Sequence, residues 1–209
     1  MKLDLTRILL DHETVPEDPT SDAYTSHYRY QLINSSFNVP AKLNHRASSW
    51  KWCCRCCNPY EVAATIEFTK IVYEPLEIFM DGRVAFESEP SCFVMSLQGQ
   101  HGGNGCLLSP LSVVNDGLSE LLVVRGRPGP SGMLSFMNAT TKGGGVHGYD
   151  PNILLMRGES FKVVPKRQTD VPHIFAIDGE PLYFNKFIKY ESIPEAIEVL
   201  VDYEILMES

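Results

Sequence analysis

The chain has 209 residues, 44% of them hydrophobic and 21% charged, which is ordinary for a soluble globular domain able to bury a core. Its formal charge of −8 argues against nucleic acid as a partner and against broad attraction to anionic membranes, so any lipid would have to be held in an apolar pocket. No apolar run approaches the roughly 20 residues that span a bilayer, and the N-terminus lacks a signal-peptide pattern. We therefore expect a cytoplasmic protein, with peripheral membrane contact as an alternative.

Residues 1–23 are predicted to form a leader or linker. Leu3 to Leu10 could form one helix or strand, and an acidic, proline-containing segment follows from Asp11 to Asp22. Residues 24–50 have weak hydrophobic periodicity, and no element is predicted there. Folding of that region could require a partner domain. The folded domain is placed at residues 24–209.

A cysteine cluster lies at residues 53–57, where Cys-Cys-Arg-Cys-Cys contains two overlapping Cys-x-x-Cys pairs. Basic residues surround the nearby Trp50 and Trp52, so this stretch could touch a membrane surface or form a solvated loop. Three interpretations of the thiols stay open: a zinc site completed by His45 or a distant thiol, reversible acylation, or free cysteines in a reducing compartment.

Short elements follow Pro59. A helix is predicted at residues 61–72, where Val62, Ala63 and Ile66 fall on adjacent turns, and Pro75 ends it. Residues 76–80 and 83–87 flank Asp81-Gly82, a strong hairpin signal. Strands are also predicted at residues 92–98, 120–125, 152–157, 161–165, 173–177 and 196–205, and an amphipathic helix at residues 132–141. The pattern predicts a mainly β fold with few helices, a sandwich or a barrel.

The segment Asp178-Gly179-Glu180 follows the apolar run from Ile174 to Ile177, and Asp-Gly pairs favour tight turns. A β-hairpin is its simplest interpretation. A second turn signal at Asn115-Asp116-Gly117 and a glycine-rich run at residues 99–105 accompany it. Together these three elements suggest an anion or metal site.

These motifs, in this order, resemble the C-terminal half of the diacylglycerol and sphingosine kinases, and the sphingosine and ceramide kinases most. The resemblance covers roughly residues 55–204 and rests on Phe93–Gln98, Gly102–Gly105, Ser109-Pro110, Asn115–Leu118, Asp178–Glu180 and Ile193–Val201. It implies a β-sandwich-like lipid kinase domain. The family's N-terminal α/β nucleotide-binding domain, with its Gly-Gly-Asp-Gly-Thr loop, has no counterpart: Gly102–Gly105 and Gly143–Gly145 do not continue into that pattern.

The resemblance also implies three groups of site residues. Asp178, Gly179 and Glu180 would lie near the nucleotide phosphates and their Mg²⁺, with Glu180 as a catalytic residue. The Asp116 carboxylate and the backbone carbonyls of Val113 and Leu118 would hold a structural Mg²⁺. An acyl-chain pocket would be lined by Met133, Phe136 and Met137. Each group has a structural alternative: a well-packed hairpin, a turn in which Asp116 caps its own backbone, and ordinary core packing.

The implied reaction is the ATP-dependent phosphorylation of a lipid hydroxyl on a sphingoid base, ceramide or diacylglycerol. Because the nucleotide loop and the family's catalytic acid are not found in the sequence, we expect the reaction to need a kinase N-terminal domain in trans. Two alternatives are a non-catalytic lipid-binding or regulatory module and an incomplete gene product.

Overall fold

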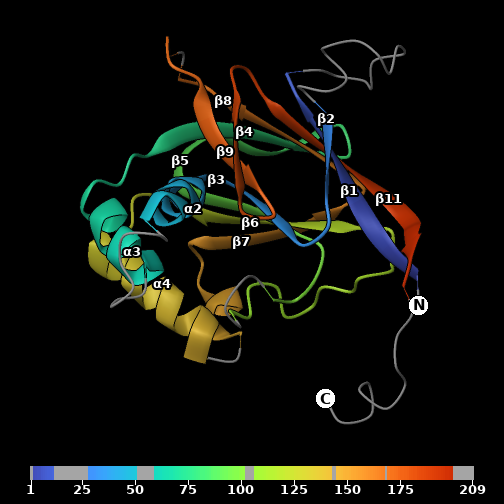
Figure 1. The fold of residues 1–209 in the computed structure, drawn as a ribbon, viewed down its shortest axis with the longest axis horizontal. Helices are drawn as coiled ribbons and strands as arrows, with labels where there is room; N and C mark the ends of the chain where they lie inside the picture. Colours follow the sequence, from blue (N-terminus) through green and yellow to red (C-terminus); the bar gives the residue numbers. More distant parts are fainter. Residues whose placement is uncertain are drawn as a thin grey trace.

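A computed structural model describes residues 2–11, 28–50, 59–101, 106–142, 145–167 and 169–199, in which eleven strands carry three α-helices on one side (Figure 1). The strands are β1 (Lys2–Leu10), β2 (Tyr28–Gln31), β3 (Asn34–Asn38), β4 (Glu74–Met80), β5 (Arg83–Leu97), β6 (Ser119–Arg125), β7 (Ile153–Gly158), β8 (Ser160–Pro165), β9 (His173–Ile177), β10 (Glu180–Phe184) and β11 (Ile188–Glu198). The helices are α2 (Val39–Trp50), α3 (Pro59–Thr69) and α4 (Pro130–Lys142), and a 3₁₀ helix, η2 (Val146–Tyr149), follows α4.

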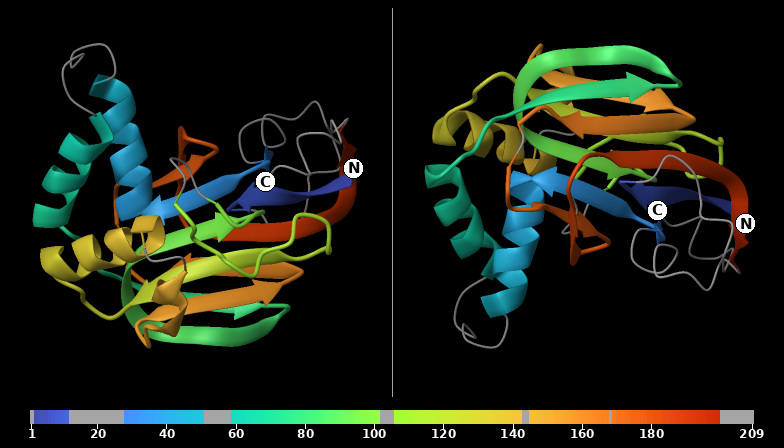
Figure 2. Two further views of the ribbon diagram at one scale, coloured as in Figure 1. Left: turned by 90° about the horizontal axis from the view of Figure 1, so that it is seen from below. Right: turned by 90° about the horizontal axis from the view of Figure 1, so that it is seen from above.

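All strand pairs are antiparallel, and the sheet curls back on itself into a sandwich-like form (Figure 2). The main path runs β10-β9-β3-β5-β4-β8-β11-β1-β2, while β6 and β7 branch from β5. The 15-residue strand β5 makes this possible, because its first half pairs with β4 and its second half with β3 and β6. The register shifts between Ser91 and Phe93, where pairing passes from one set of neighbours to the other.

The inner core lies between the facing parts of the curled sheet. Alternate residues of each contributing strand point inward, as the two-residue period of a strand requires. Ile78 of β4 and Val163 of β8 are paired and both fully buried. Phe175 is also fully buried, with its ring edge-on to Phe184 and Tyr190. This apolar interior holds the sandwich together.

A second core joins the helices to the outer face of β5 and β6. Strand β6 is buried on both faces: Leu121 and Val123 belong to the inner core, whereas Leu122 and Val124 face the helix side. Phe93 of β5 meets Phe136 of α4 edge-on, with ring centroids 5.1 Å apart. The helices are therefore held against the sheet by side chains that alternate with those of the sandwich core.

The predicted mainly β, sandwich-like fold with few helices is confirmed, as are the Asp81-Gly82 hairpin and the helices near residues 61–72 and 132–141. The last described strand, Ile188–Glu198, begins before the strand predicted at residues 196–205, because Ile188 and Tyr190 fill the inner core. Residues 200–205 of that prediction lie outside the described residues. No helix within the described ranges is long and apolar enough to cross a membrane.

The N-terminal part of the chain differs from the prediction. Residues 2–10 do not form a leader: β1 pairs with both β11 and β2, and its Ile8 and Leu10 are buried in the inner core. Residues 34–38 form a buried strand between β5 and β9. These elements depend on partners distant in sequence, which local periodicity does not reveal. Residues 12–23 of the predicted leader or linker lie outside the described residues.

Candidate functional site

A pocket of about 1020 Å³ lies between the three α-helices and the outer face of β5. Its helical walls come from Val39, Pro40, Leu43 and Asn44 of α2, Tyr60, Ala64, Thr65, Phe68 and Thr69 of α3, and Pro130, Ser131, Leu134, Met137 and Thr141 of α4. Its other walls are Phe93, Met95, Ile33, Asn34, Cys106, Leu108, Asp178 and Gly179. Most of these side chains are apolar, so the pocket suits an apolar ligand.

The spacing of apolar residues along α2 and α3 brings them to the faces that line the pocket. Val39 and Leu43 are four residues apart on α2, as are Ala64 and Phe68 on α3, so each pair lies on one face of its helix. At the opening, Ile33 and Leu134 are 52% and 56% exposed. The pocket therefore has an apolar interior and an apolar rim.

Of the three residues predicted to line an acyl-chain pocket, Met137 does so and the other two do not. Met133 is fully buried in the helix–sheet core, where its Sδ lies 3.6 Å from the Cys92 Sγ. Phe136 lines a separate small pocket and is 6% exposed. Neighbouring apolar residues of α4 therefore have different surroundings: Met133 packs in the core, Phe136 lines the small pocket and Met137 lines the large pocket.

The turn Asp178-Gly179 forms part of the pocket wall and joins β9 to β10. Both residues have positive φ, 46° and 89°, as a two-residue type I′ hairpin requires. The Asp178 carboxylate accepts backbone N–H bonds from Leu32, Ile33 and Asn34 at 2.8, 2.9 and 2.9 Å. The Asp178 N–H also donates to the Asn34 carbonyl at 2.8 Å. Asp178 therefore clamps the β2–β3 turn to the pocket rim.

Glu180, the predicted catalytic residue, begins β10 opposite Ile177. It is exposed and does not line the apolar pocket. Its carboxylate has no hydrogen bond or ion pair with any residue that the structure describes. Glu180 is thus available to a group outside the described chain, whereas the neighbouring Asp178 is engaged.

Asp116, the predicted metal ligand, lies elsewhere. Its Oδ2 forms an ion pair with Arg157, and its Oδ1 accepts the Leu118 N–H at 3.0 Å, as in the turn-capping alternative. Val113 is a partly exposed loop residue, 46% accessible. No group of three or more His, Cys, Asp or Glu side chains is placed to hold a metal within the described residues. The Arg157 guanidinium neutralises Asp116 in this arrangement, which disfavours a Mg²⁺ beside that carboxylate.

A buried glutamate adjoins this ion pair. Glu120 of β6 is 4% exposed and pairs in register with Arg157 of β7, whose Nε lies 3.7 Å from the Glu120 Oε1. Burial raises the pKa of Glu120 to about 7.

Helix α2 is the part of the site that the sequence did not predict. Asn38, which precedes it, has φ 68° and donates from Nδ2 to the Val72 and Ser91 carbonyls at 2.9 and 3.2 Å. Burial lowers the pKa of Lys42, whose Nζ donates to the Asn38 Oδ1 at 3.3 Å. The pair Asn38-Val39 before Pro40 is a helix-start signal that could have revealed α2. Cys53–Cys57, Gly102–Gly105 and Gly143-Gly144 lie outside the described residues.

Comparison with known proteins places this geometry in a family. Residues 35–201 match the family described as the YegS C-terminal NAD kinase beta sandwich-like domain. Among curated proteins, none matches significantly. A solved structure of a diacylglycerol kinase from Bacillus anthracis str. Sterne is 14% identical, with a TM-score of 0.56 over 93% of this chain. A putative diacylglycerol kinase from the same organism is 15% identical, with a TM-score of 0.63 over 98% of this chain.

The chain spans about half the length of these two structures, 52% and 57%. At such low identity the likeness shows the fold alone. The family match covers most of the chain and includes the motifs quoted above, so the predicted resemblance to the C-terminal half of the diacylglycerol and sphingosine kinases is confirmed. This protein belongs to the family of YegS C-terminal NAD kinase beta sandwich-like domains.

Proposed function

We propose that this chain is the lipid-binding half of a lipid kinase. It holds the chain of a lipid alcohol between α2, α3 and α4, and the lipid hydroxyl lies at the Asp178-Gly179 rim. One observation carries the proposal: a pocket of about 1020 Å³ has mainly apolar walls and a single carboxylate-bearing turn beside an unengaged glutamate. The substrate class is a sphingoid base, a ceramide or a diacylglycerol.

The energetics of the pocket favour a long apolar chain. Each methylene taken from water into such a site contributes about 0.8 kcal/mol. Met95 of β5 and Met137 of α4 both line the pocket, and flexible thioethers adapt to irregular chains. The exposed Ile33 and Leu134 give the opening an apolar rim, which suits a protein that takes its ligand from a membrane surface. We expect the chain to work from the cytoplasm by such peripheral contact.

The chemistry requires a second domain. ATP, with Mg²⁺, supplies the phosphoryl group: the lipid hydroxyl oxygen bonds to the γ-phosphorus, the bond to the ADP oxygen breaks, and a base takes the hydroxyl proton. In this proposal a nucleotide-binding domain in trans or on a longer chain binds ATP and provides the base. Asp178 fixes the rim, and Glu180 faces the partner, where its carboxylate orients the hydroxyl or binds Mg²⁺.

A non-catalytic lipid-binding or regulatory module is the second candidate. It is favoured by the engagement of Asp178 with three backbone N–H groups and by the exposure of Glu180. In that case the same pocket binds lipid, and the turn serves only the fold.

Phosphate transfer separates the two candidates. The purified chain is incubated with labelled ATP, Mg²⁺ and sphingosine, ceramide or dioctanoylglycerol, with and without a separately expressed nucleotide-binding domain of a related kinase. The kinase proposal predicts lipid binding by the chain alone and phosphate transfer only with the added domain. Glu180→Gln should lower kcat by about 100-fold with unchanged lipid affinity. Binding without transfer, or transfer insensitive to Glu180→Gln, would contradict the catalytic role.

A further inference from the structure

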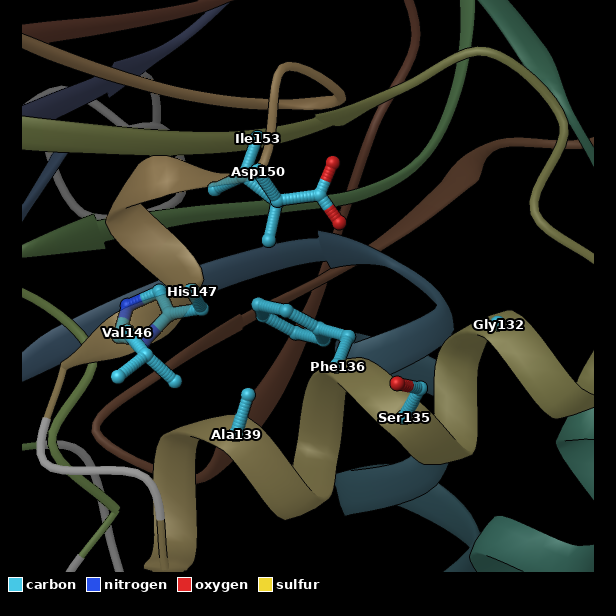
Figure 3. Close-up of a pocket in the computed structure, with 8 residues that line it drawn as sticks. All are labelled: Gly132, Ser135, Phe136, Ala139, Val146, His147, Asp150 and Ile153. Carbon is cyan, nitrogen blue, oxygen red and sulfur yellow. The ribbon is translucent and has the colours of Figure 1, made fainter.

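A second, smaller pocket, drawn in Figure 3, is lined by α4 residues other than those that line the lipid pocket. Its volume is about 220 Å³, room for about seven waters, so it is too small for a lipid chain. Ser135, Phe136 and Ala139 come from α4, and they face Val146, His147 and Asp150 across the pocket. The two pockets share no lining residue.

The pocket is built on a fixed frame. Phe136 is 6% exposed, and its ring lies edge-on to Phe93 at 5.1 Å and to His147 at 6.0 Å. Gly145, which leads into η2, has φ 89°, and a Cβ there would lie 2.6 Å from the Pro110 Cγ. Only glycine satisfies this turn without strain. The local backbone is therefore specified to bring His147 against Phe136.

His147 carries an unsatisfied acceptor. It is 2% exposed, and its Nε2 lies 2.8 Å from the Leu108 carbonyl oxygen. Because a carbonyl only accepts, the neutral imidazole carries its proton on Nε2 and keeps a lone pair on Nδ1. Nδ1 has no partner among the described residues, although buried polar atoms are nearly always paired. This buried imidazole in the pocket wall calls for a hydrogen-bond donor.

The other polar groups that line the pocket can also accept hydrogen bonds from a ligand. The Asp150 Oδ1 accepts the Asn152 backbone N–H at 2.8 Å and its Nδ2 at 3.0 Å, and Asp150 has no ion pair with a described basic residue. Ser135 adds a hydroxyl, and the Phe136 ring offers a face that attracts cations. Among the side chains that the structure describes, neither Lys nor Arg lines the pocket, so an anion would find no countercharge from them.

We propose that this pocket binds a small organic ammonium compound, such as an amino alcohol or a short amine. The ammonium group pairs with the Asp150 carboxylate beside the Phe136 ring, and donor groups of the ligand satisfy Ser135 and His147. The site is independent of the lipid pocket, and Phe136 separates it from Phe93 in the lipid-pocket wall.

The test is titration calorimetry and methyl NMR on the whole chain with ethanolamine and choline, with ethylene glycol as the uncharged control. Saturable binding of an amine should shift the Val146 and Ile153 methyl signals and leave those of Leu43 in the lipid pocket unchanged. Asp150→Asn keeps an oxygen for the Asn152 N–H and removes the charge, so affinity should fall by about tenfold or more.

Asp170→Asn, at an exposed aspartate that lines neither pocket, is the charge-matched control and should bind like the wild type. A thermal melt of both variants establishes that they are folded. The proposal is overturned if neither amine binds saturably, if ethylene glycol binds equally well, or if Asp150→Asn and Asp170→Asn have the same effect.

Discussion

Replacing Asp178 with Gly tests the clamp that shapes the rim of the lipid pocket. Gly keeps the positive φ of 46° and removes the carboxylate that accepts three N–H bonds. Such bonds to a charged group contribute about 1.5–3 kcal/mol each when buried, and solvent reduces this at an exposed turn. We take a loss of about 2 kcal/mol in the free energy of unfolding as the expected total.

Urea denaturation measures this loss. With an m-value of about 2 kcal/mol/M, the midpoint should fall by about 1 M at unchanged m. Because the β2–β3 turn carries Ile33 and Asn34 of the pocket wall, its release should also weaken the binding of a fluorescent lipid alcohol. We therefore expect the lower urea midpoint and the weaker lipid binding to occur together in Asp178→Gly.

Asp81→Gly is the matched control. Asp81-Gly82 forms the same kind of hairpin, with φ of 49° and 76°, and the Asp81 carboxylate accepts the Ser160 N–H at 2.8 Å. It lies outside the lipid pocket, so its loss should destabilise the fold by a smaller amount and leave lipid affinity unchanged. The clamp interpretation is refuted if Asp178→Gly unfolds at the wild-type midpoint, or if both variants weaken lipid binding equally.

Three further outcomes are expected. Met133→Ala should cost about 2–5 kcal/mol of unfolding free energy because it opens a cavity in the core, whereas Met137→Ala should chiefly weaken lipid binding; equal stabilities in urea would contradict this division. Glu120 favours its protonated form in the folded state, so its contribution to stability is present at low pH and lost as pH rises from its ordinary pKa to about 7. Between pH 5 and 8, the unfolding free energy measured in urea should fall by about 1–3 kcal/mol less in Glu120→Gln than in the wild type. The same pH dependence in both proteins would contradict the raised pKa of Glu120. Because Arg157 neutralises Asp116, millimolar Mg²⁺ should not raise the Tm relative to EDTA, and a Mg²⁺-dependent rise lost in Asp116→Asn would show a metal site instead.

Local signals predicted the middle and C-terminal parts of the fold. Asp81-Gly82 and Asp178-Gly179 are turn signals whose geometry depends on two adjacent residues, and both hairpins form as predicted. Residues 3–10 were predicted only as one helix or strand of a leader, and the place of β1 in the sheet was missed because its partner β11 lies far away in the sequence. No local periodicity reports such a pairing, although the alternation of Thr6, Ile8 and Leu10 was visible.

The site was predicted in part. Met137, which was predicted to line an acyl-chain pocket, does line the apolar pocket. Asp178 and Gly179 line it too, although they were predicted to lie near nucleotide phosphates, and that role stays a prediction. Helical spacing could not distinguish Met137 from Met133, since the two lie four residues apart and only the position of β5 decides which is core. The three backbone N–H groups that bond to the Asp178 carboxylate come from a turn far away in the sequence, so this structural role of Asp178 could not be predicted from the sequence alone.

The location of bound lipid tests the central claim most directly. With ¹³C-methyl methionine, NMR spectra of the chain are recorded during titration with a short-chain diacylglycerol or sphingosine. Met95 and Met137 line the lipid pocket, whereas Met156 lies in the sandwich core. The account predicts that the Met95 and Met137 methyl signals shift and saturate while that of Met156 stays in place. Unchanged Met95 and Met137 signals under saturating lipid would contradict it.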